Sequence, residues 1–139
     1  MFDIENDIFD TISKALKEIY PNITVNSDYL NAPSTFPAVS IQEVDNFIVK
    51  SMRTINVENA NQIVYEINVF SNKTVGKQSE AKKILNSVDE ILTNLNFTRT
   101  MKNVIPNFNN ATIFRIAARY EAKIGLAELP NTYFIYQTN

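Results

Sequence analysis

The sequence has 139 residues, of which 45% are hydrophobic and 20% are charged, and its formal net charge at pH 7 is -2. This length suits one domain with one hydrophobic core, so we expect a single domain over residues 1–139. The sequence contains no cysteine and no histidine, which excludes disulfides, Cys/His zinc sites and a Ser-His-Asp triad.

The first predicted element is an amphipathic helix over residues 3–19, which Pro21 ends. Its apolar stripe recurs at helical spacing and consists of Ile4, Ile8, Ile12, Leu16 and Ile19. Acidic residues crowd the first turns, where the helix dipole favours anions. Dipole matching is our preferred interpretation of this acidic start, and a docking role is the alternative. Because the chain begins acidic rather than basic, it does not resemble a secretory signal, and we expect a cytoplasmic protein.

Two strands, with a loop between them, follow the first helix. Residues 23–25 predict a short strand, and the two prolines of residues 31–37 predict a loop. Residues 38–44 alternate, with Val39 and Ile41 on one face, which is typical of a half-buried strand.

Residues 45–60 are polar and weakly patterned, so we interpret them as a long hairpin connection whose arms can be strand-like. Loops of this length are uncommon in compact domains and are often functional. The apolar residues Phe47, Ile48 and Met52 stand among the polar ones, next to Arg53. Either these residues pack at the edge of the core or they contact a partner, and both interpretations stay open.

The second half of the chain has the clearest patterns. Residues 61–71 and 111–124 predict strands with one apolar face each. Between them, residues 77–94 predict a helix with a buried stripe, and residues 97–101 a short strand.

The strand predicted at 111–124 carries charges on its second face. Arg115 and Arg119 lie four residues apart in one strand, so both point the same way. A solvated face with cross-strand ion pairs is the preferred interpretation, and a contact with a neighbouring subunit is the alternative, because arginine is enriched at interfaces. The candidate interface residues are therefore Phe47, Ile48, Met52, Arg53, Arg99, Arg115 and Arg119.

These elements predict an α+β fold in the order α-β-β-β-α-β-β, with an optional last strand at 133–136. We expect a mainly antiparallel sheet of four to five strands with two helices packed on one face, since this arrangement buries every predicted apolar stripe.

The sequence offers little recognisable chemistry. Its two glycines cannot form a Gly-rich phosphate loop. The carboxylates of Glu43, Asp45 and Glu66 do not identify a catalytic pair. No basic excess indicates a nucleic-acid partner, and no apolar run approaches the roughly 18 residues of a membrane span. We expect no catalytic site, cofactor or metal, and an assembly role instead. A small carboxylate-dependent enzyme and a host-encoded regulatory module are the alternatives.

Five short stretches of the sequence carry a family resemblance. They are Phe36 to Glu43, Tyr65 to Lys73, Phe97 to Met101, Ile105 to Asn107 and Arg115 to Glu121. Together with the order of elements over residues 1–124, they resemble the tail terminator (tail completion, minor capsid) proteins of long-tailed bacteriophages and phage-tail-like particles.

The resemblance implies an α+β subunit of a hexameric ring in the virion tail, assembled in the cytoplasm of the bacterial host. Such a ring caps the tail tube, stops its growth and offers a surface for joining the head. The implied partners are other copies of the chain, the tail tube protein and head–tail connector proteins. Related head–tail adaptors and tail tube subunits are the alternatives within this class.

Overall fold

The computed structural model of the chain describes residues 4–27, 33, 35–48, 60–106, 111–126 and 133–136. Along the chain they form α1 (Glu5–Ile19), β1 (Thr24–Asn26), β2 (Ala38–Ile48), β3 (Ala60–Ser71), α2 (Lys77–Asn94), β4 (Thr98–Ile105), β5 (Phe114–Leu126) and β6 (Tyr133–Tyr136). The predicted order of elements is confirmed, and β6 is the optional last strand.

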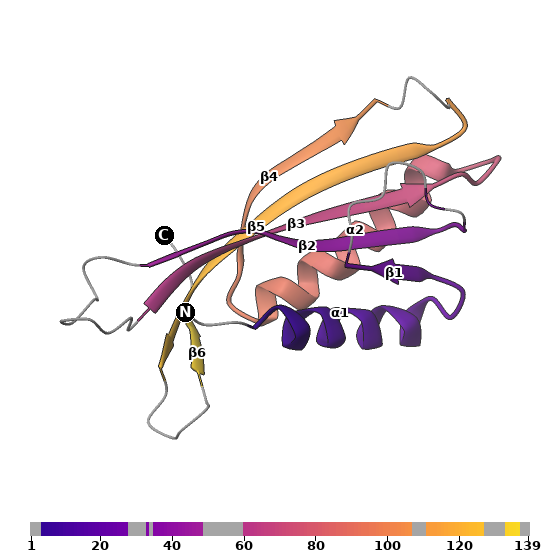
Figure 1. Cartoon of the computed structure of the whole chain (residues 1–139). Coiled ribbons are helices and arrows are strands. Elements are labelled where there is room, and N and C mark those ends of the chain that lie inside the picture. The colour runs from indigo at the N-terminus through magenta and orange to yellow at the C-terminus, as the bar shows by residue number, and fades with distance from the viewer. Residues whose placement is uncertain are drawn as a thin grey trace.

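The strands form one mixed sheet in the order β1-β2-β3-β5-β4, with β6 paired to the end of β5. The short strand β1 runs parallel to β2, and all other pairs are antiparallel. Both helices lie on the same face of this sheet (Figure 1). The predicted α+β fold, mainly antiparallel with two helices on one face, is therefore confirmed.

Helix α1 packs on the sheet through its predicted apolar stripe. Ile8, Ile12 and Leu16 are at most 2% exposed, because a spacing of four residues places them on one face of a helix. Glu5 and Asp7 occupy the first turn, where the helix dipole favours negative charge. The sequence pattern alone thus accounts for this helix and for its orientation on the sheet.

Two residues in the left-handed region delimit α2. Gly76 precedes the helix with a φ of 86°, which glycine adopts without steric cost. Asn96 follows the helix with a φ of 68°. Its N–H donates to the Thr93 carbonyl at 3.0 Å, and the N–H of Phe97 donates to the Leu92 carbonyl at 2.9 Å. This Schellman arrangement satisfies the last carbonyls of the helix and turns the chain into β4.

The main core lies between the helices and the sheet, where the largest fully buried side chains include Tyr65, Phe97 and Tyr120. The rings of Tyr65 and Phe97 meet edge to face, with centroids 5.7 Å apart. The hydroxyl of Tyr120 donates to Oδ1 of Asp89 at 2.8 Å. Burial, reinforced by this carboxylate, raises the pKa of Tyr120 above its ordinary value of 10.0.

The strand boundaries differ from the predicted ones at polar segments. Pairing of β2 with β3 continues to Ile48 and Asn61, so residues 45–48 form a strand-like arm of the connection predicted over 45–60. Residues 49–59 lie outside the described residues. Strand β4 runs to Ile105, four residues beyond its predicted end. It lies at the edge of the sheet with few buried side chains, so its sequence lacks the alternation that marks a half-buried strand.

Candidate interaction surfaces

The face of the sheet turned away from the helices, here called the outer face, is formed by every second residue of the central strands. Register and alternation place on it Ala38, Ser40 and Gln42 of β2; Val64, Glu66, Asn68 and Phe70 of β3; and Arg115, Ala117, Arg119 and Glu121 of β5. Two of the predicted interface residues, Arg115 and Arg119, therefore lie on one surface.

A chain of polar contacts joins these two arginines through β3. Nε of Arg115 donates to Oδ1 of Asn68 at 3.0 Å, and Nδ2 of Asn68 donates to Oε2 of Glu66 at 3.5 Å. Nε of Arg119 donates to Oε1 of the same Glu66 at 3.3 Å. Asn68 is fully buried. The arginines are thus held by buried or half-buried partners rather than by surface ion pairs alone.

A second, small apolar cluster lies at one end of the outer face. Phe70, Ala38 and Ile113 are buried in it, and Phe36 packs against them. The Arg115 guanidinium carbon lies 5.5 Å from the centre of the Phe70 ring, a cation–π distance. The sequence analysis missed this cluster. The sequence feature that could have indicated it is Phe70, an aromatic residue on the less apolar face of its strand.

Several side chains of the outer face are less exposed to solvent than a fully solvated face would be. Ala117 is 2% exposed and Ser40 is fully buried, whereas the Arg119 side chain is 48% exposed. Arg119 is exposed and makes a cross-strand ion pair with Glu66, as the solvated interpretation expects, and Arg115 and Glu121 are half-buried.

The other predicted interface residues lie elsewhere. Arg99 pairs with Tyr120 in register and therefore lies on the helix side, where Nη1 is 3.3 Å from Oδ1 of Asp89. Phe47 and Ile48 belong to β2. Met52 and Arg53 lie outside the described residues. The structure thus brings together two of the seven candidates, Arg115 and Arg119, in one network.

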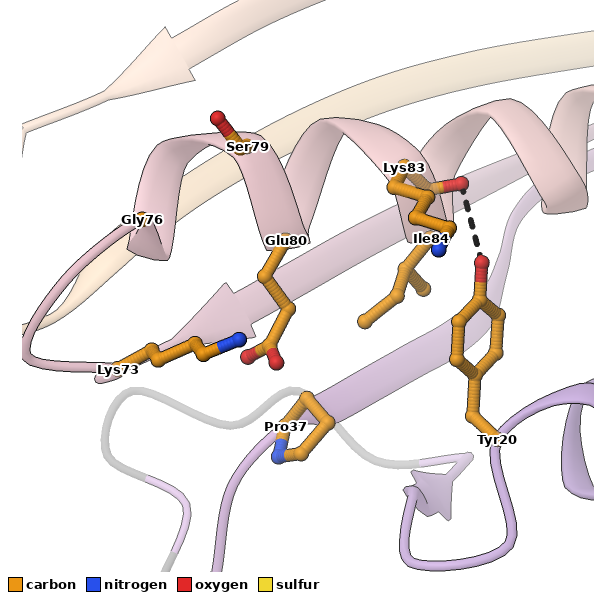
Figure 2. A pocket seen from close by; sticks show the side chains of 8 residues that line it. All are labelled: Tyr20, Pro37, Lys73, Gly76, Ser79, Glu80, Lys83 and Ile84. Atoms are coloured by element: carbon orange, nitrogen blue, oxygen red, sulfur yellow. Dashed lines mark hydrogen bonds between the residues drawn. The ribbon is translucent and has the colours of Figure 1, made fainter.

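A cleft opens where the end of α1, the start of β2 and the start of α2 meet (Figure 2). It has a volume of about 370 Å³, and its walls are formed by Tyr20, Pro37, Lys73, Gly76, Ser79, Glu80, Lys83 and Ile84. A smaller hollow of about 250 Å³ adjoins it and shares Tyr20, Pro37 and Glu80. No sequence pattern predicts this cleft, because its walls come from three segments far apart in the chain.

Internal contacts fix two polar groups of the cleft. The Tyr20 hydroxyl lies 3.4 Å from the Lys83 carbonyl, to which it donates, and 3.0 Å from Oγ of Ser87. Glu80 accepts a hydrogen bond of 2.7 Å from Oγ of Ser71. Glu80 is the sole carboxylate among the described residues that line the cleft, so the cleft does not supply two converging acids.

The carboxylates singled out in the sequence do not converge either. Glu43 pairs with Tyr65 in register and lies on the helix side, whereas Glu66 lies on the outer face. Asp45 is exposed, beyond an irregularity that separates it from Glu43 in the register. Within the described part of the chain, no three carboxylates gather as metal ligands would, and no helix is long and apolar enough to cross a membrane.

The chain was compared with known proteins by family and by sequence. No family model matches it, and no curated protein matches it. What can be said of its role therefore rests on the sequence resemblance and on the surfaces described above.

Proposed function

We propose that this chain is a structural protein of a phage tail or phage-tail-like particle, which caps the tail tube as a ring. The ring ends tail growth and provides the surface that joins the head. The proposal rests on the five stretches that resemble tail terminators and on the element order that accompanies them. It assigns no substrate and no cofactor.

The observation that best supports an assembly role is the outer face. It combines fixed arginines, a fully buried asparagine and a small apolar cluster. Arginine and aromatic residues are enriched at the centres of protein interfaces. Because Arg115 and Arg119 are already oriented by Asn68 and Glu66, less side-chain entropy is lost when a partner binds.

In the proposed ring, identical copies contact one another through two different surfaces. Such heterologous contacts close into a ring when the rotation between neighbours divides a full turn. We propose six copies, as the family resemblance implies. The partners on the ring's two faces are the tail tube protein and head–tail connector proteins.

A tail tube subunit is the second candidate within this class. The observation that favours it is the paired extension of β2 and β3 as far as Ile48 and Asn61, since a tube subunit is expected to carry an extended hairpin arm. The carboxylate-dependent enzyme gains no such support, because Glu43 and Glu66 lie on opposite faces of the sheet.

Native mass spectrometry and negative-stain microscopy of the purified protein test the proposal. We expect one closed oligomer, either in solution at high concentration or on the ends of added tail tubes. A protein that stays monomeric and does not bind tube ends would contradict the proposal. The neighbouring genes give an independent check, because tail genes are expected there and metabolic genes are not.

A further inference from the structure

Helix α2 carries its charges in the order that its own dipole disfavours. Lys77, Lys82 and Lys83 lie in its first half with one acid, Glu80, and Asp89 and Glu90 lie in its second. The dipole favours anions at the start of a helix and cations at its end. The acidic start of α1 can be explained by its dipole, but this arrangement in α2 cannot.

The two helices are antiparallel, so their charges add up across the molecule. The start of α1 and the end of α2 lie at one end of the helix layer (Figure 1). We call this the acidic end, and it contains Glu5, Asp7, Asp10, Asp89 and Glu90, with Arg99 paired to Asp89. We call the opposite end the basic end, and it contains Lys17, Lys73, Lys77, Lys82 and Lys83, together with Glu18 and Glu80. A chain of net charge -2 thus has two ends of opposite charge.

The basic end is also where the molecule is hollowed. Lys73 and Lys83 border the cleft on two sides, and the Lys73 side chain extends toward Glu80 (Figure 2). Two large apolar side chains are exposed near this end, with Val75 82% and Ile19 56% accessible. A concave surface with basic edges and exposed apolar side chains suits an acidic, convex protein partner.

We propose that the basic end of one copy docks on the acidic end of the next copy. The inference rests on the proposed ring and names the two different surfaces that meet in it. The occupant is a second copy because the chain itself presents the complementary charge. Like ends repel each other, so head-to-head pairing is disfavoured and the contact is heterologous, as ring closure requires.

Charge reversal at each end tests this contact in the full-length protein. The variant K73E/K83E makes both ends acidic, and the variant D7K/D10K/E90K makes both ends basic. All five side chains are exposed, so the substitutions should leave the fold intact, which circular dichroism checks. Self-association is measured by sedimentation velocity over a range of protein and salt concentrations.

We expect each variant alone to self-associate about tenfold or more weakly than the wild type, because like charges face each other in the contact. Mixing the two variants in equal amounts should restore association, since basic ends then meet acidic ends. The chain carrying all five substitutions should also associate, with its polarity reversed. Wild-type association should weaken between 0.1 and 1 M NaCl, where the screening length falls from about 10 to about 3 Å.

The matched control is K14E/K102E, which also exchanges two exposed lysines for glutamates, but in the middle of α1 and on β4, away from both ends and from the outer face. It should associate as the wild type does. Equal weakening by the control would show a general effect of net charge and overturn the proposal. Failure of the mixture and of the fivefold variant to associate would overturn it as well.

The outcomes separate this contact from the proposed function. A wild-type ring that is indifferent to all these reversals contradicts the end-to-end contact and leaves the ring in place. If the wild type and the mixture both remain monomeric in solution, the contact is rejected, and the capping function is decided separately by binding to tube ends.

Discussion

The two faces of the sheet are built from the same strands but are stabilised in different ways. The helix side is apolar throughout its centre, with Ile67 and Tyr120 fully buried. The outer face combines the arginine network with a small apolar cluster. One face therefore has its partner within the chain, in the form of two helices. The other face presents polar side chains that are held in place by hydrogen bonds to one another.

The difference shows how a short chain can use one face of a sheet for its core and the other face for contacts with partners. Strand residues alternate between faces, so a change on one face leaves the other in register. Most of the stability should therefore depend on the helix side, and assembly should depend on exposed residues. Each prediction below tests this separation at a different position.

The largest expected effect is on the helix side. Ile67→Ala should lower the free energy of unfolding by about 2–5 kcal/mol, because it leaves a cavity in the main core. Val64→Ala, on the outer face of the same strand, is the matched control and should cost less than about 1 kcal/mol, since Val64 is half-buried. Urea unfolding followed by circular dichroism measures both. Equal losses would show that the two faces contribute alike.

A smaller loss is expected from the buried polar residue of the outer face. Asn68→Ala should cost about 1–3 kcal/mol, because Arg115 and Glu66 each lose a partner. Gln62→Ala, on the same face of the same strand and half-buried, should be nearly neutral in urea unfolding. A neutral Asn68→Ala would mean that the network does not stabilise the outer face.

The hydroxyl of Tyr120 makes the stability of the fold dependent on pH. Burial raises the pKa of this hydroxyl in the folded state. Its contribution to the free energy of unfolding is therefore fully present below pH 10, the ordinary pKa of tyrosine, and is lost as the pH rises above 10. Tyr120→Phe should cost about 1–2 kcal/mol at pH 8 and should show a shallower decline of stability between pH 9 and 11. Urea unfolding across this range measures the slope. Identical slopes in both proteins would contradict the assignment.

The smallest effect on stability is expected at Arg119. Its side chain is about half exposed, and it makes an ion pair with Glu66, so Arg119→Ala should change the free energy of unfolding by about 0–1 kcal/mol. The same substitution should nevertheless weaken oligomer formation, measured by native mass spectrometry, if the outer face is a contact. A stable variant with unchanged assembly would remove Arg119 from the interface.

Local patterns predict both helices and the central strands well because each of these shows its buried face in the sequence, whereas the edge strand β4 does not. The alternation in residues 61–71 and 111–124, and the stripe of residues 77–94, depend only on neighbours along the chain. The cluster around Phe70 could not be predicted, since Ile113 and Phe36 reach it from distant segments. The cleft was missed for the same reason.

The charge arrangement was visible in the sequence but could not be interpreted there. Lysines at the start of the second helix and acids at its end become meaningful once the helices are known to be antiparallel. For the acidic start of the first helix, the sequence favours dipole matching, with a docking role as the alternative. With α2 beside it, the same residues become part of a charged end of the molecule.

Labelling at tail tube ends tests the central claim most directly. The chain, tagged with gold and incubated with tail tubes from a particle encoded beside its gene, is imaged by negative stain. The account predicts gold at one end of the tubes, a ring there, and no further tube growth when free tube subunits are added. Gold along the tube walls, or tubes that stay unlabelled and continue to grow, would contradict it.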